Sequence, residues 1–181
     1  ALKQYGVLDT TPEASFDDIA HLAARICGTA MAAVSLVDAE RQWFKAEVGL
    51  GVRETPRPLS FCAHAMLADA AMVVKDAQQD PRFADNALVT GPPHIRFYAG
   101  HPLKTPDGVS LGALCVLDET PRPEGLTELQ TMALKTLADQ VMTQLELRRA
   151  LLERDRSQDI ARLAMEASAY VGAWDWDIAQ N

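Results

Sequence analysis

The sequence predicts an α+β fold in which paired antiparallel strands form a sheet, amphipathic helices cover it, and a long helix follows near the C-terminal end. Two observations support this prediction. Short apolar segments bounded by turn residues come in pairs, at 31–48 and again at 95–117, which is typical of neighbouring strands joined by short links. From Thr127 onward, apolar residues recur at three- and four-residue steps, with no glycine or proline before Gly172. This spacing indicates one continuous helix.

The first helix is predicted to start near Pro12 and to end at Gly28. Thr10 or Thr11 can cap it, since threonine hydroxyls accept hydrogen bonds from the first free backbone N–H groups. Glu13 stands three residues after Thr10, as in a capping box. The apolar positions of this segment follow helical spacing and form a narrow, alanine-rich face: Phe16, Ile19, Ala20, Ala23, Ile26 and Cys27.

The first strand pair is predicted at Met31–Val37 and Arg41–Val48, antiparallel because the link between the two segments has hairpin length. A proline-rich loop at 55–58 then leads into a short helix, Ser60–Leu67, capped by Ser60. Met72–Lys75 follows as a brief strand.

Residues 76–93 read as a long structured loop with one helical turn, and a loop of this length inside a compact domain is often functional. Two further strands, Ile95–Leu103 and Ser110–Leu117, flank a turn at Pro106-Asp107-Gly108, where proline presets one torsion and glycine accepts the left-handed one. The second strand is apolar on both faces, which predicts a central position in the sheet.

The long helix is expected to run from 127 to 169, beginning with a Thr127–Gln130 capping pair. At 1.5 Å per residue it would reach roughly 60 Å, more than one small domain can cover. Such a helix packs against a partner chain or forms a rod between domains. Beyond it, Ala173–Ile178 alternates apolar and acidic residues as a strand would, and we expect the chain to be a piece of a longer protein.

Composition excludes several classes of function. Hydrophobic residues make up 48% of the 181 residues and the formal net charge is −8, which disfavours a broad nucleic-acid-binding face. No apolar run approaches the roughly 20 residues of a membrane-spanning helix. Three cysteines, Cys27, Cys62 and Cys115, are an odd number and lie far apart. We predict that they are buried packing residues in a reducing cytoplasm, forming neither a metal site nor a disulfide framework.

Several motifs together resemble the GAF domain, a sensory module. The resemblance covers most of residues 1–150 and rests on Tyr5–Thr10, Val34–Asp38, Arg41–Lys45, Ser60–His64, Asp80–Phe83, Ile95–Gly100 and Leu111–Asp118. It implies a GAF-like antiparallel sheet of five or six strands, helices on one face that mediate dimerisation, and a ligand pocket on the other. The stretch from Ala164 to Asp177 resembles the opening of a PAS domain. The expected domains are therefore 1–126, a GAF sensory domain; 127–169, a linker and signalling helix; and 170–181, the start of a PAS domain.

The resemblance leaves the ligand open, because GAF domains bind cyclic nucleotides, bilins, haem, iron or small metabolites. Bilin-binding relatives attach the chromophore through a cysteine directly followed by histidine, whereas Ala63 separates Cys62 from His64 here. This speaks against covalent bilin attachment. The Asn-Lys…Phe-Asp-Glu signature of cyclic-nucleotide binders is absent, and residues 94–98 lack the cysteine of the free methionine sulfoxide reductase branch. The cofactor stays unknown.

The candidate ligand-binding residues are His94, Arg96 and Tyr98 at the mouth of the long loop, with Phe61 and His64 opposite. Arginine can hold a carboxylate or phosphate while an aromatic ring stacks on an apolar part. The alternative, which we favour, is that Arg96 pairs with an acid such as Asp80 or Asp85 and pins the loop down. No metal ligands or catalytic residues are predicted, because residues two apart on a helix, such as Cys62 and His64, point about 200° away from each other.

The predicted function is a cytoplasmic sensory and dimerisation module that is not itself an enzyme. Its pocket, or the loop 76–93, would bias the long helix, which would relay the change to a downstream PAS domain and an output histidine kinase or diguanylate cyclase. The expected partner is a second copy of the chain, joined through the N-terminal and C-terminal helices. Two alternatives remain: a small redox enzyme of the methionine sulfoxide reductase class acting through Cys62 or Cys115, and a ligand-free structural spacer.

Overall fold

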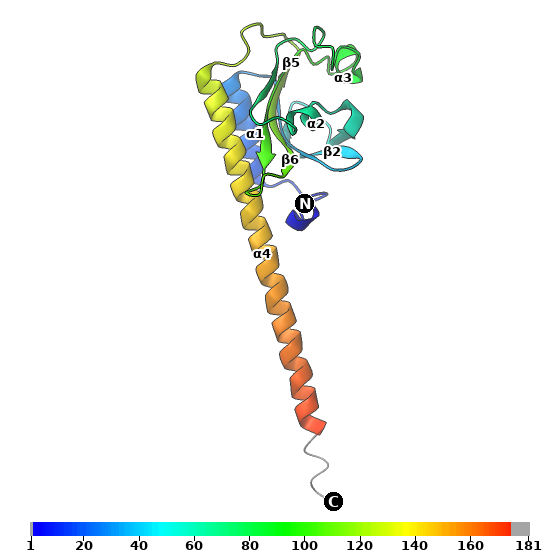
Figure 1. The fold of residues 1–181 in the computed structure, drawn as a ribbon, viewed down its shortest axis with the longest axis vertical. Coiled ribbons are helices and arrows are strands. Elements are labelled where there is room, and N and C mark those ends of the chain that lie inside the picture. Colours follow the sequence, from blue (N-terminus) through cyan, green and yellow to red (C-terminus); the bar gives the residue numbers. More distant parts are fainter. Residues whose placement is uncertain (1, 175–181) are drawn as a thin grey trace, which may run out of the picture.

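The computed structural model describes the backbone of residues 2–174 and the side chains of residues 2–167. A six-stranded antiparallel sheet, in the order β3-β2-β1-β6-β5-β4, forms the centre of the domain (Figure 1). Its strands are β1 (Met31–Val37), β2 (Arg41–Val48), β3 (Glu54–Pro56), β4 (Met72–Val74), β5 (Phe97–Lys104) and β6 (Ser110–Asp118). The helices are η1 (Leu2–Tyr5), α1 (Ala14–Cys27), η2 (Arg57–Leu59), α2 (Phe61–Ala65), α3 (Ala87–Thr90) and α4 (Glu128–Trp174).

The predicted α+β fold and its antiparallel sheet are confirmed, and the apolar strands β1 and β6 lie at the sheet centre. One strand was missed. Glu54–Pro56 pairs with the start of β2 as an edge strand, where the sequence indicated only a proline-rich loop. An edge position explains why Pro56 is tolerated, since a strand at the sheet edge has one side on which no N–H group is needed.

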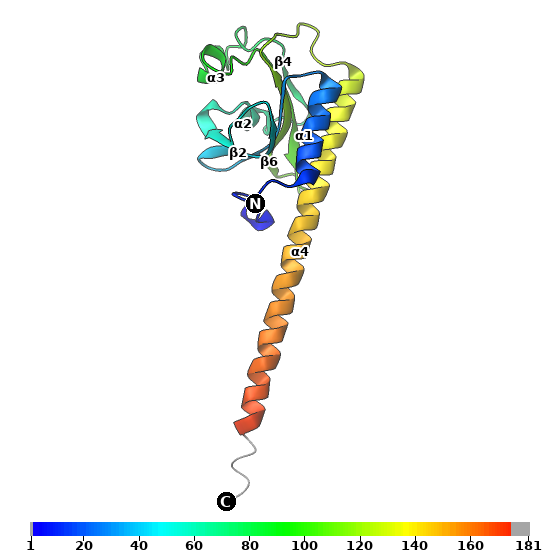
Figure 2. The same cartoon turned by 180° about the vertical axis from the view of Figure 1, so that it is seen from behind.

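The two long helices, α1 and α4, lie side by side on one face of the sheet (Figures 1 and 2). Strand side chains alternate, so Ala32, Val34 and Leu36 of β1 pack beneath these helices. The predicted apolar face of α1 is buried there, including Phe16 and Ala20. The opposite face is covered by α2, α3 and the loop between β4 and β5, which together enclose a second, separate apolar core.

The start of α1 differs from the prediction. The helix begins at Ala14, and Glu13 is its N-cap residue without a side-chain capping bond. Thr10 instead donates a hydrogen bond to the Val7 carbonyl and accepts one from the ammonium group of Lys45. The capping box is therefore wrong, because the buried lysine from β2 engages both side chains that would have formed it.

Helix α4 begins as predicted, with Thr127 and Gln130 exchanging hydrogen bonds of 3.0 and 3.2 Å. Leu134 and Leu145 are fully buried against the domain, whereas apolar side chains beyond the sheet, such as Ile160, are exposed. The helix then projects as a rod (Figure 1) and continues to Trp174. The strand predicted at 173–178 is thus wrong for its first two residues, which are helical, and the rest lies outside the described residues.

No helix in the described part of the chain is both long and apolar enough to cross a membrane. Although α4 has 47 residues, charged side chains recur along it from Glu128 to Glu166.

Candidate functional site

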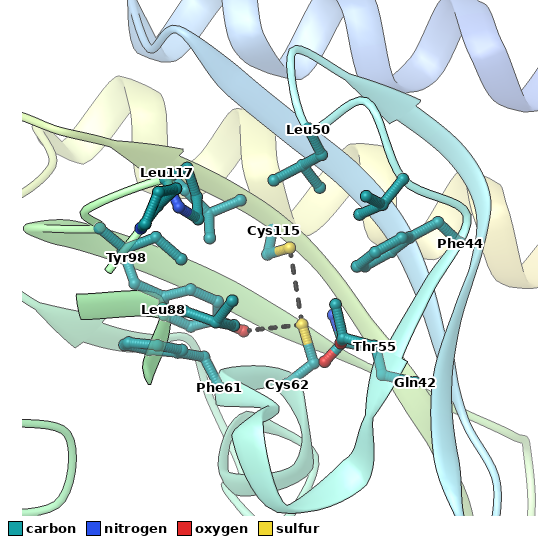
Figure 3. A pocket seen from close by; sticks show the side chains of 14 residues that line it. Gln42, Phe44, Leu50, Thr55, Phe61, Cys62, Leu88, Tyr98, Cys115 and Leu117 are labelled. Carbon is teal, nitrogen blue, oxygen red and sulfur yellow. Dashed lines mark hydrogen bonds between the residues drawn. The ribbon is translucent and has the colours of Figure 1, made fainter. Parts of the chain in front are cut away.

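A cavity of about 280 Å³ lies between the sheet and the layer formed by α2 and the loop before β5 (Figure 3). Its wall is mostly apolar and comes from four strands (β2, β3, β5 and β6), from helices α2 and α3, and from the loops that follow β2 and α3. The apolar side chains that form most of this wall are Phe44, Leu50, Phe61, Leu88, Ile95 and Leu117. None of the residues that line the cavity carries a charge. The cavity therefore suits a small, largely apolar molecule.

A few polar groups also reach the cavity. The amide oxygen of Gln42 accepts a hydrogen bond from the Ser60 hydroxyl, which itself caps α2 by accepting from the Ala63 N–H at 2.9 Å. The Thr55 hydroxyl oxygen is buried and has no hydrogen-bond partner within the described part of the chain. Because buried polar groups are normally paired, this hydroxyl is available to a bound molecule.

Two thiols meet at the wall of the cavity. The Sγ atoms of Cys62 on α2 and Cys115 on β6 are 3.5 Å apart. The Tyr98 hydroxyl donates a hydrogen bond to the Cys62 Sγ at 3.2 Å, and the Cys115 thiol donates to the Ala33 carbonyl at 3.6 Å. Figure 3 shows this line of contacts running from the tyrosine through both sulfur atoms. All three side chains are fully buried in the protein matrix.

These contacts give the two thiols different acidities. Burial alone raises the pKa of Cys62, but the interactions of its sulfur with the side chains of Cys115, Ser35 and Tyr98 outweigh burial and hold the pKa of Cys62 below its usual value. The hydrogen bond to Cys62, together with burial, raises the pKa of Cys115. The pKa of Tyr98 is raised as well, chiefly by burial. Cys62 is therefore the first of the three to ionise, with the other two as hydrogen-bond donors.

Stacked aromatic rings hold α2 in place beside the cavity. The rings of Phe61 and Phe83 stack with centroids 4.1 Å apart, and Tyr98 lies 5.2 Å from Phe61. His64 contacts the edge of Phe83 at 5.0 Å. Since aromatic pairs add to the free energy of burial, this cluster anchors the loop that carries Phe83 to the helix that carries Cys62.

The structure brings only some of the predicted site residues to the cavity. Phe61 and Tyr98 line it, whereas His64, His94 and Arg96 are not among the lining residues. His64 and His94 are exposed at the surface of the same region.

Arg96 makes a two-pronged ion pair with Asp76, with two contacts of 2.7 Å. This pair links the start of the loop to its end. An ion pair of Arg96 that holds the loop was the favoured alternative from the sequence, but the acid is Asp76 and neither Asp80 nor Asp85. The hydrogen bond from Arg96 lowers the pKa of Asp76. Asp80 pairs instead with Arg82.

Sequence reasoning missed the contact between Cys62 and Cys115. All three cysteines are correctly predicted to be buried. Cys62 and Cys115, however, are 53 positions apart in the sequence, so no local pattern connects them. Alternation along β6 indicates that Cys115 shares a face with Ala113 and Leu117. Nothing in the pattern specifies where α2 rests on that face. Within the described residues, no group of three or more histidine, cysteine, aspartate or glutamate side chains could hold a metal ion.

Comparison with known proteins places the chain among sensory domains. The model of the GAF domain family matches residues 11–145. A cyclic di-GMP phosphodiesterase of Pseudomonas aeruginosa is 44% identical over 147 residues, which are 81% of this chain but 25% of that protein. The chain thus spans only a quarter of the length of this curated relative.

Solved structures agree in fold. The GAF domain of an Acinetobacter phosphoenolpyruvate-protein phosphotransferase has a TM-score of 0.60 at 17% identity, covering 84% of this chain and 94% of that one. A free methionine-R-sulfoxide reductase from Neisseria meningitidis has a TM-score of 0.61 at 19% identity, covering 82% and 87%. At these identities, the likeness concerns the fold alone.

Proposed function

Because the chain belongs to the GAF domain family, we propose that it is a sensory module that passes the state of its cavity to an output domain through α4, without being an enzyme itself. One observation carries this proposal: the cavity and α4 lie against opposite faces of the same strand. On β6, Cys115 and Leu117 line the cavity, while Leu114 and Val116 belong to the core beneath α1 and α4. A displacement of β6 by a ligand therefore reaches the helix directly, because close-packed cores transmit strain.

The cavity chemistry supports a neutral, mainly apolar ligand. The wall has no charged group to compensate a phosphate or carboxylate, and burying an unpaired charge is very unfavourable. One hydrogen-bonding group on the ligand could satisfy the Thr55 hydroxyl. The predicted role of Arg96 in holding an anion has less support, since its guanidinium is already paired with Asp76.

We further propose that the output domain belongs to the same parent protein and follows α4. The domain division at 1–126, 127–169 and 170–181, with a PAS domain beginning in the last segment, is part of this proposal, as is a cytoplasmic location. The sequence favours a histidine kinase or a diguanylate cyclase as output. The name of the P. aeruginosa relative favours, within that range, an output concerned with cyclic di-GMP.

The relay can be tested with indole as a small neutral probe, followed by two-dimensional NMR of the ¹⁵N-labelled chain. We expect indole to shift the amide signals of Tyr98 and Leu117 at the cavity and also those of Val141 and Leu145 on α4. Leu88→Trp, which fills the cavity from α3, should abolish both sets of shifts. Leu129→Trp is the matched control, because that leucine is 67% exposed on α4. Cavity shifts without any change on α4 would refute the relay.

The proposed homodimer has a matching surface where α4 leaves the domain. A groove there is lined by Phe16 of α1 and by Leu147 and Leu151 of α4, and both leucines are about half exposed. A second copy of the chain would cover these side chains, as amphipathic helices do when they pair.

Analytical ultracentrifugation tests this interface. The double variant Leu147→Gln/Leu151→Gln should sediment as a monomer at concentrations where the wild-type chain is dimeric. Lys135→Gln/Asp139→Gln is the control: it introduces the same residue twice, preserves net charge and removes only an exposed ion pair. Equal dimerisation of both variants would contradict the proposed interface.

A further inference from the structure

The only two cysteines on the cavity side of the sheet, within the described residues, lie in contact with each other. Cys62 and Cys115 have 3.5 Å between their sulfur atoms, and both line the cavity. The third cysteine, Cys27, belongs to the core beneath α1 and α4 on the other face. A pair of thiols at this distance can become covalently bonded after a small movement of one of them, whereas Cys27 has no such neighbour among the described residues.

The sulfur atom of Cys62 has polar neighbours, which a cysteine that only packs does not need. It receives a hydrogen bond from the Tyr98 hydroxyl at 3.2 Å, and the Cys115 sulfur lies 3.5 Å from it. Donors around a sulfur atom stabilise its thiolate, and the thiolate is the form that attacks oxidants. Both cysteines line the cavity although each is only 1% exposed, so the cavity is where a small oxidant would meet their sulfur atoms.

We propose that Cys62 and Cys115 form a peroxide-reactive dithiol that closes into a disulfide inside the cavity. This deepens the proposed sensory function: the cavity would respond to a hydroperoxide by covalent modification. Disulfide formation can be measured without any relay through α4. Only the effect of the disulfide on an output domain rests on the proposed function.

The reaction balances in two steps. The Cys62 thiolate attacks one peroxide oxygen, the O–O bond breaks, and the departing oxygen leaves as water or an alcohol after taking up a proton. Cys62 is then a sulfenic acid. The Cys115 sulfur attacks the Cys62 sulfur, the S–O bond breaks, and the hydroxyl leaves as water with the Cys115 proton. Overall, two thiols lose two electrons and two protons, and one peroxide is reduced.

The consequence for the cavity follows from where each cysteine is held. Cys115 lies in the middle of β6, which is bonded to β1 on one side and to β5 on the other. Cys62 lies on α2, a helix of five residues that is attached through side chains. Closing the disulfide therefore moves α2 farther than it moves the strand, and the new bond ties α2 to β6, whose other face packs beneath α1 and α4. The oxidised cavity would differ in shape from the reduced one.

The test uses the 181-residue chain, reduced and freed of reductant, then treated with hydrogen peroxide and quenched with catalase. We expect the number of free thiols, titrated after unfolding, to fall from three to one, and the intact mass to fall by two hydrogen atoms. Dithiothreitol should restore both. Cys27→Ala should still form the disulfide, whereas Cys62→Ser and Cys115→Ser should not. In Cys115→Ser, dimedone should trap a sulfenic acid on Cys62.

The selectivity of peroxide for Cys62 and Cys115 over Cys27 distinguishes the proposed reaction from accidental oxidation. In the chain unfolded by guanidinium, all three cysteines should react alike, whereas in the native chain Cys27 should be spared. Three intact thiols after peroxide treatment, or equal loss of Cys27, would overturn the proposal. Because the readout is the thiol count, this failure is distinct from a failure of the indole experiment.

Tyr98→Phe tests the assigned role of the tyrosine as a positioning residue. Cys115 and Tyr98 are the titratable groups in contact with Cys62, and no charged residue lines the cavity. Losing the hydroxyl should shift the pH profile of peroxide reaction upward and slow it about fivefold at neutral pH. Tyr5→Phe, whose hydroxyl bonds to Glu146 on the far side of the fold, is the matched control. An unchanged pH profile in Tyr98→Phe would show that the Tyr98 hydroxyl does not stabilise the Cys62 thiolate.

Discussion

The ion pair between Lys45 and Glu13 offers the sharpest test of how the fold is held together. The ammonium group of Lys45 is fully buried and contacts the Thr10 hydroxyl at 2.8 Å, the Thr11 carbonyl at 2.9 Å and a Glu13 carboxylate oxygen at 2.5 Å. Arg148 of α4 reaches the same carboxylate oxygen at 2.8 Å. Glu13 therefore joins the sheet, the N-terminal segment and α4 at a single point.

Glu13→Gln keeps the shape and removes the charge. Breaking a buried ion pair by removing one partner costs about 3–5 kcal/mol, but the Glu13 side chain is 37% exposed and glutamine still accepts a hydrogen bond. We therefore expect a loss of about 2 kcal/mol in the free energy of unfolding at neutral pH. For a chain of this size, that corresponds to a melting temperature lower by about 4–8 °C.

The effect of pH has a definite sign. The hydrogen bond from Lys45 holds the pKa of Glu13 below its ordinary value of 4.5 in the folded chain. A carboxyl with a depressed pKa stabilises the fold at pH values above its unfolded pKa, and this contribution is lost as pH falls through the folded pKa. The difference between wild type and Glu13→Gln should thus be largest near neutral pH and shrink steadily on acidification.

Urea unfolding followed by circular dichroism, at about pH 7 and about pH 3.5, measures these differences. The double variant Lys45→Met/Glu13→Gln is the informative companion, since it replaces both charges of the pair and should be less damaging than Lys45→Met alone, which leaves the Thr11 carbonyl and the Glu13 carboxylate without their lysine donor. The reasoning fails if the double variant is as damaging as the sum of the two single variants, or if the effect of Glu13→Gln does not diminish in acid.

Two further predictions concern packing. Leu145→Ala removes the last fully buried leucine of α4 and should cost about 2–5 kcal/mol, whereas Leu129→Ala, at a side chain 67% exposed, should stay within about 0.5 kcal/mol. Equal losses in urea unfolding would mean that α4 is not anchored as described. Gly112→Ala places a methyl group 2.0 Å from the Ser35 carbonyl oxygen and should destabilise the chain by about 3 kcal/mol or more. Gly108→Ala, with open space around it at φ +84°, should cost only about 1 kcal/mol, and a thermal melt that ranks the two glycines the other way would refute the clash.

Patterns that depend on near neighbours in the chain were predicted well. The apolar face of α1, the strands β1 and β6, the Ser60 cap of α2 and the Thr127–Gln130 pair all follow from spacing within a few residues. These elements form because backbone geometry repeats with a fixed period, so the side chains of one face recur at regular positions. The loop at 76–93 with one helical turn was predicted from its proline and glycine residues, and it contains α3.

Lys45 shows where local reasoning stops. A lysine within a strand is normally expected to face solvent. Its burial here depends on an acid 32 residues earlier in the chain, whose carboxylate also pairs with Arg148, farther away still. The same interaction removed the predicted capping box of α1, because the side chains that would have capped the helix turn toward the ammonium group. No pattern within the first helix contains that information.

The candidate site divides in the same way. The sequence by itself determined that the chain would make an antiparallel sheet with a long helix, that all three cysteines would be buried, and that Tyr98 would lie at the mouth of the long loop with Phe61 opposite. Only the tertiary structure decided that Asp76 is the acid that pairs with Arg96, that no charged side chain lines the cavity, and that Cys62 meets Cys115. The physical reason is that side-chain periodicity is set by the backbone of one segment, whereas a contact between distant segments depends on how helices and loops settle on the sheet, a choice made by the packing of the whole core.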